Sequence, residues 1–156
     1  MEKKIILKLM ADKLNIDLNE VSKSSTSELE AIAYLAQTKG FNFPYHFYLE
    51  DSGRVGCGEI RGDIADICSL DYDTSELNLS ENSVKILEQV SETIQENDPV
   101  LLASLHFLIF RNQLKSKEKE LRINEARERL GEYKRSYFYL ELKRAYETLE
   151  TEGLVK

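Results

Sequence analysis

Residues 97–110 read NDPVLLASLHFLIF, and this stretch decides the fold. Asp98 is a good N-cap and Pro99 suits the first helical position, so we expect a helix from Pro99 to about Gln113. Its first three turns are apolar on nearly every side. Such a helix is stable only when other elements surround it, so it is expected at the centre of a helical domain.

Apolar residues at helical spacing predict further helices on both sides of this stretch. We expect them at 3–14, from Ser27 to Gly40, around 60–68, from Ser80 to about 94, through the charged stretch 115–130, and from about Ser136 to Glu150, with 15–26 as a loop or short helix. The Ser27-x-x-Glu30 pattern predicts a capping box, and Gly40 a left-handed end.

Gly131 is expected to separate the last two helices. The final helix should turn four residues inward, namely Tyr137, Leu140, Tyr146 and Leu149.

The stretch Pro44–Glu50 alternates and is rich in aromatic residues, which favours an extended segment over a helix. Asp51-Ser52-Gly53 predicts a turn after it, so we expect a strand or hairpin near 43–57. The whole chain is therefore predicted to be a mainly α, single helical domain, 1–156, with six or seven helices. The cysteines Cys57 and Cys68 form no CxxC pattern and are expected as free thiols.

Charge is distributed unevenly along the chain, whose net charge is −7. Residues 25–110 form an acidic body with fifteen acidic and four basic residues, whereas the basic helical segment 111–144 has eleven basic and six acidic residues. Such an asymmetry bears on binding partners rather than on the fold.

The basic helical segment 111–144 has the element order of a helix-turn-helix or winged-helix-like unit, and aromatic residues lie among its cations. Lysine and arginine side chains on such a unit neutralise phosphates. One hypothesis is therefore a transcriptional regulator that binds nucleic acid through Lys115, Lys119, Arg122, Arg129, Lys134 and Arg135. The interleaved glutamates favour the alternative of a salt-bridged helix surface.

Glu59, Asp63 and Asp66 share one helical face, as Glu88 and Glu92 do on another helix. If the two faces converged they would hold Mg²⁺, which makes a metal-dependent nucleotide hydrolase a second alternative. A zinc site formed by the two histidines and two cysteines has no support, because their spacings match no compact zinc module. We therefore expect no metal and no cofactor.

Tyr45, Phe47 and Tyr48 are the candidate partner-binding residues. An exposed aromatic segment is a frequent source of binding energy at protein interfaces. The alternative for these side chains is packing in the core. The partner would be another protein or a second copy of the chain.

Three segments resemble the YwgA-like and Panacea-domain families of helical proteins. They are Ala33-Tyr34-Leu35-Ala36-Gln37 with Gly40 and Phe47-Tyr48-Leu49, then 101–108, then Leu142 with Ala145, Leu149 and Gly153-Leu154-Val155. The resemblance implies a non-enzymatic role as an antitoxin, adaptor or regulator, and transfers no catalytic residue.

These observations favour a non-enzymatic regulatory or adaptor protein that acts by protein–protein interaction. The chain begins with a charged amphipathic stretch rather than an apolar signal core, and its longest apolar run is too short to span a membrane. We therefore expect a cytoplasmic protein without membrane segments.

Overall fold

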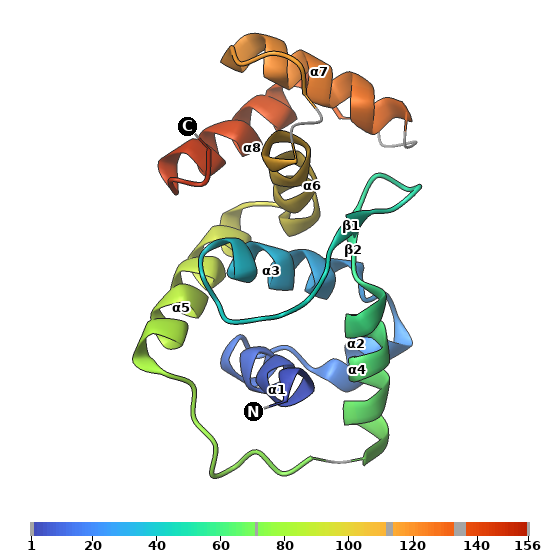
Figure 1. Ribbon diagram of the computed structural model, residues 1–156, viewed down its shortest axis with the longest axis vertical. Helices are drawn as coiled ribbons and strands as arrows, with labels where there is room; N and C mark the ends of the chain where they lie inside the picture. Colours follow the sequence, from blue (N-terminus) through green and yellow to red (C-terminus); the bar gives the residue numbers. More distant parts are fainter. Residues whose placement is uncertain (1, 71, 112–113, 133–136, 156) are drawn as a thin grey trace.

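The computed structural model describes residues 2–70, 72–111, 114–132 and 137–155. Within these ranges the chain forms eight helices and one two-stranded antiparallel sheet (Figure 1). In chain order they are α1 (Lys3–Lys13), α2 (Leu18–Lys23), α3 (Ser27–Thr38), β1 (Tyr48–Leu49), β2 (Val55–Gly56), α4 (Gly58–Leu70), α5 (Glu81–Glu96), α6 (Pro99–Phe110), α7 (Lys119–Glu132) and α8 (Tyr139–Thr151). The predicted mainly helical fold with a small hairpin is confirmed.

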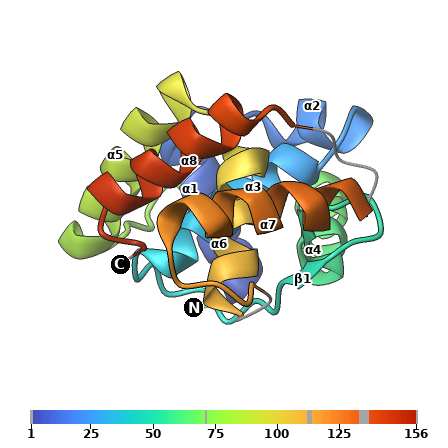
Figure 2. The ribbon, with the colours of Figure 1, turned by 90° about the horizontal axis from the view of Figure 1, so that it is seen from above.

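Helix α6 lies at the centre, as its apolar sequence predicts. The Asp98 side chain accepts a hydrogen bond from the Val100 amide, and Pro99 occupies the first turn. All residues of 101–108 are buried, and α6 packs against α3, α7 and α8. Figure 2 shows α7 and α8 lying over α6 and α3. The helix ends at Phe110 with Arg111 as its C-cap, so it is shorter than the predicted helix to about Gln113; residues 112–113 lie outside the described ranges.

Helix α3 begins one residue earlier than its pattern predicts. Thr26 is the N-cap, and Ser27 is the first helical residue, so the predicted capping by Ser27 is wrong. The Glu30 carboxylate accepts a hydrogen bond from the Thr26 hydroxyl (2.8 Å) instead of from the backbone N–H of Ser27, so the capping box predicted at Ser27 does not form.

The carboxylate of Glu30 connects α3 to the start of α4. The side chain is only 2% exposed, yet it accepts hydrogen bonds from the Cys57 amide (2.7 Å) and from the Arg61 guanidinium (3.1 Å). With Thr26, these donors satisfy both of its oxygens. A buried carboxylate is tolerated only when it is paired in this way.

A left-handed turn ends α3. Gly40 has φ +102°, and the amides of Gly40 and Phe41 donate to the carbonyls of Gln37 (3.1 Å) and Ala36 (3.0 Å). This is the Schellman arrangement, and it confirms the predicted end of the helix. The turn reverses the chain, so the extended segment that follows runs back along α3 (Figure 1).

Side chains of the extended segment 41–47 alternate between core and solvent. The aromatic rings of Phe41, Phe43, Tyr45 and Phe47 are buried, whereas the residues between them are exposed. Tyr45 is 3% exposed and Phe47 is 8% exposed, so the prediction of an exposed aromatic contact is wrong for both. The segment lies against the helices instead of extending from them. Only Tyr48, 45% exposed, fits that prediction.

The last two helices differ from their predicted form at two points. Helix α7 continues through Gly131, which is exposed and has no close neighbour, so the predicted interruption there is wrong. Gly131 is the next-to-last residue of α7, so the helix ends one residue after the predicted interruption rather than at it. In α8 the buried residue is Leu142 rather than Leu140, which is exposed.

Helices α7 and α8 pack against each other, as a helix-turn-helix requires, but their connection passes through 133–136, outside the described residues. The described residues after Phe110 contain no strand that would form a wing. Cys57 and Cys68 are free thiols, as predicted. No helix in the described ranges combines the length and the apolar character needed to cross a bilayer.

Replacing Glu30 tests whether its hydrogen bonds hold α3 to α4. In Glu30→Ala the buried Cys57 amide loses its acceptor, so the free energy of unfolding should fall by about 2 kcal/mol. Urea denaturation measures the change. Glu28→Ala removes an exposed carboxylate from the same helix and should change stability by less than about 0.5 kcal/mol. Equal losses in the two variants would contradict this role of Glu30.

Candidate functional site

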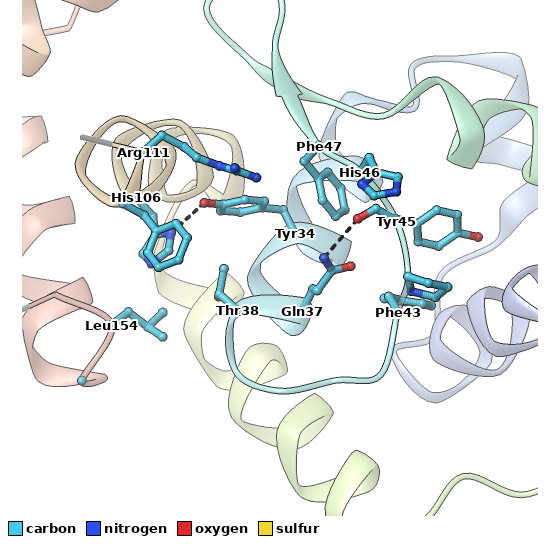
Figure 3. Close-up of a pocket in the computed structure, with 13 residues that line it drawn as sticks. Tyr34, Gln37, Thr38, Phe43, Tyr45, His46, Phe47, His106, Arg111 and Leu154 are labelled. Carbon is cyan, nitrogen blue, oxygen red and sulfur yellow. Dashed lines mark hydrogen bonds between the residues drawn. The ribbon is translucent and has the colours of Figure 1, made fainter. Parts of the chain in front are cut away.

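A pocket of about 690 Å³ opens where the extended segment 43–47, α3, the end of α6 and residues 153–154 meet (Figure 3). The turn at Gly40 places the extended segment beside α3. A second left-handed turn at Gly153 (φ +74°) brings Leu154 to the pocket. A pocket of this size is in the range of ligand-binding sites.

Aromatic residues form much of the apolar wall, namely Tyr34, Phe43, Phe47 and Phe110. Tyr45 borders the pocket with its backbone, because its ring points away towards Lys3 and Asp63 (Figure 3). Tyr34 meets Phe47 edge to face, with ring centroids 5.3 Å apart. Phe110 is 67% exposed and stacks on the His106 imidazole at 5.5 Å. Phe110 therefore covers one side of His106 while keeping most of its own ring in solvent.

His106 is buried on the pocket wall and holds two segments together. The Tyr34 hydroxyl lies 2.7 Å from its Nδ1, and the backbone of Leu154 also hydrogen-bonds the ring. The contact with Leu154 raises the His106 pKa, so the ring donates there. A neutral imidazole has one N–H, which leaves Nδ1 to accept a hydrogen bond from the Tyr34 hydroxyl. Burial outweighs this contact and lowers the pKa of His106 to about 4.

Gln37 and Arg111 supply the remaining directed polar groups. The Gln37 amide nitrogen donates to the Tyr45 carbonyl (3.1 Å), while its oxygen is buried without a hydrogen-bond partner. The Arg111 guanidinium is exposed and lies 5.5 Å from the Phe107 ring centroid. Burial raises the pKa of the Tyr34 hydroxyl above its usual range, and the positive charge of Arg111 partly opposes that rise.

The charge of the pocket differs from that of the acidic body. Arg111 is the only arginine or lysine among the described lining residues, and none of those residues is acidic. The neutral His106 adds no charge near pH 7. Among the described side chains no carboxylate forms a salt bridge with Arg111. The pocket therefore offers a single cation beside aromatic walls.

Sequence reasoning identified only part of this site. Of the predicted contact residues, Tyr45 and Phe47 lie in the pocket wall and Tyr48 lies outside it. His106 is 4% exposed and has Tyr34 as a hydrogen-bond partner. The function of Tyr34 and Gln37 as lining residues was missed. Their spacing of three residues on one helix face was the available signal.

The acidic residues of α4 have separate partners. A hydrogen bond from Lys3 lowers the pKa of the Glu59 carboxyl, and Asp63 accepts from the Tyr45 hydroxyl (2.6 Å). Asp66 lies 3.9 Å from Lys4. Helix α1 packs between α4 and α5, so these residues do not meet Glu88 and Glu92 (Figure 1). Within the described ranges no three histidine, cysteine or acidic side chains form a metal-binding group.

Several candidate nucleic-acid contacts are engaged within the protein. Lys119 pairs with Glu147 (3.3 Å) and Glu150 (3.0 Å) on α8. The Arg122 guanidinium donates to the Tyr146 hydroxyl, and Arg129 pairs with Glu132. The Lys115 side chain is exposed. Lys134 and Arg135 lie outside the described residues, so their contribution stays a prediction.

The depressed pKa of His106 predicts a pH dependence of stability. The folded protein binds a proton at His106 less readily than the unfolded chain, whose value is 6.5. The free energy of unfolding is therefore at its full value above pH 6.5 and falls as the pH is lowered towards 4. The expected loss from this residue is about 3 kcal/mol.

Urea denaturation of wild type and His106→Gln between pH 7 and 4 measures how the contribution of His106 to the free energy of unfolding changes with pH. Glutamine can accept from Tyr34 and donate to Leu154 but does not titrate. The stability difference between the two proteins should therefore narrow by about 3 kcal/mol across this window. Parallel curves would show that His106 is not the residue responsible.

No family model, curated protein or solved structure matches the chain. The resemblance of three segments to the YwgA-like and Panacea-domain families therefore stays a prediction. The functional interpretation depends on the geometry of the site.

Proposed function

We propose that this protein is a non-enzymatic regulatory or adaptor module of the cytoplasm that binds a segment of a protein partner. The pocket between α3, the segment 43–47 and α6 is the binding site. This proposal is supported by one observation: the pocket combines aromatic walls with a few directed polar groups. Apolar walls of this kind anchor a ligand, and the polar groups fix its orientation.

The polar groups of the pocket support binding rather than proton transfer. His106 accepts from Tyr34 and donates to Leu154, so both ring nitrogens are occupied. Its pKa of about 4 keeps the ring neutral near pH 7. A general base is most effective when its pKa lies near the working pH. The imidazole is therefore suited to holding the Tyr34 hydroxyl and Leu154 in position.

The rim of the pocket supports a protein partner. Phe110 presents most of its ring to solvent, and the adjacent Arg111 is exposed as well. Aromatic and arginine side chains account for much of the binding energy at protein interfaces. A partner segment that entered the pocket would cover both residues and remove the exposed apolar surface of Phe110 from water.

Filling the pocket tests the proposal. Thr38 lines the pocket at the end of α3 and makes only a local hydrogen bond to the Leu35 carbonyl. In Thr38→Trp the indole should occupy the pocket and exclude the partner. Partners are captured from the native organism's extract by wild type and variant, and are compared by quantitative mass spectrometry. We expect at least a tenfold loss of the specific partner in the variant.

The matched control is Leu140→Ser, which removes an exposed apolar side chain on α8, away from the pocket. It should retain the same partner at wild-type level. Thermal unfolding of both variants verifies that they are folded. Partner recovery that is equal in wild type and Thr38→Trp, with both folded, would refute binding through the pocket.

A further inference from the structure

We infer that the pocket recognises the C-terminal residue of a partner polypeptide when that residue is aromatic. This inference rests on the proposed function and specifies the chemistry of the occupant. Three features of the pocket match the three groups of such a residue: the aromatic ring, the free carboxylate and the amide N–H.

The ring is matched by the aromatic wall. Phe47 and Tyr34 already meet edge to face, and Phe43 also lines the pocket along the segment 43–47 (Figure 3). Aromatic pairs in offset or edge-to-face geometry gain stability beyond the area that they bury. An aromatic side chain is therefore favoured over an aliphatic one of similar size.

The carboxylate is matched by Arg111. This cation lines the pocket without an acidic neighbour among the described lining residues, although the body of the protein is strongly acidic. An arginine without a carboxylate partner is an anion receptor, because its planar guanidinium binds two carboxylate oxygens at once. The Tyr34 hydroxyl lies near the same charge, as its effect on the Tyr34 pKa shows.

The amide N–H is matched by Gln37. Its side-chain oxygen is buried and has no hydrogen-bond partner, and the orientation of the amide is fixed because its nitrogen donates to the Tyr45 carbonyl. A buried acceptor without a donor costs free energy until a ligand supplies one. A terminal aromatic residue has a backbone N–H close to its carboxylate, whereas a simple aromatic acid has no such donor.

Small probes separate the three features. The probes are N-acetyl-Gly-Gly-Phe with a free carboxylate, the same peptide as its C-terminal amide, N-acetyl-Gly-Gly-Ala, and 3-phenylpropanoate. Calorimetry or ligand-observed NMR gives the dissociation constant of each with the full chain. We expect the free-acid Phe peptide to bind about tenfold or more tightly than any of the other three, because each of those lacks one matched group.

Variants assign each preference to its residue. In Arg111→Gln the free-acid Phe peptide and its amide should have about equal dissociation constants. The Phe peptide should still bind more tightly than the Ala peptide. Lys117→Gln removes the same charge from an exposed position that does not line the pocket, and should leave all ratios unchanged. In Gln37→Leu the preference for the Phe peptide over 3-phenylpropanoate should disappear.

The outcomes distinguish this inference from the proposed function. Equal binding of the acid and the amide, or an acid preference that survives in Arg111→Gln, overturns the inference. Equal binding of 3-phenylpropanoate and the Phe peptide also overturns it, because the backbone N–H would then contribute nothing to binding. In each case partner capture that still depends on Thr38 would leave the proposed function standing. Loss of that dependence would refute the proposed function independently.

Discussion

The buried carboxylate of Glu30 is the interaction on which the arrangement of the N-terminal half depends. It joins the start of α3 to the junction of β2 and α4 by accepting from Thr26, Cys57 and Arg61. The hairpin of β1 and β2 is too short to be stable alone, because it pairs only two residues on each strand. Its position therefore follows from this contact and from the packing of β2 on α3.

The position of α3 in turn determines the pocket. Tyr34 and Gln37 lie on the last turns of α3, and the turn at Gly40 returns the chain along the same helix face. Helix α6 supplies His106 and Phe110 from the opposite side. A salt bridge between Lys39 and Glu152 connects the end of α3 to the end of α8, beside the segment that carries Leu154. The site is thus assembled from four segments that are distant in sequence.

Much of the fold could be predicted from local patterns. The centre of the domain follows from the apolar helix after Asp98, and two helix ends follow from Ser80 and Gly40, whose side-chain chemistry and backbone freedom act over a few residues. Gly131 and Leu140 were predicted wrongly for the opposite reason. The direction of Leu140 depends on how α8 packs, which no local pattern encodes, and a glycine near the end of a helix does not by itself fix the last helical residue.

The site was harder to predict, because it requires knowing which segments meet. Nothing in the residues around Tyr34 indicates that His106, seventy-two positions later, accepts a hydrogen bond from its hydroxyl. The alternation of aromatic residues at 43–47 correctly predicted an extended segment. The same pattern, however, is compatible with a segment that projects into solvent and with one that packs on a helix. Only the reversal of the chain at Gly40 decides between them, and it places the rings inside.

The placement of α7 and α8 at one end of the molecule has an electrical consequence (Figure 1). The described residues of 111–155 carry nine basic and nine acidic side chains, whereas the described residues of 25–110 carry four basic and fourteen acidic ones, so the negative charge is concentrated towards the other end of the long axis. A charged molecule that approaches from solution is rotated by the field of this charge distribution before it touches the surface. Dissolved ions shorten the reach of the field to about 8 Å at physiological ionic strength, so this orienting torque acts only in the last stage of an encounter.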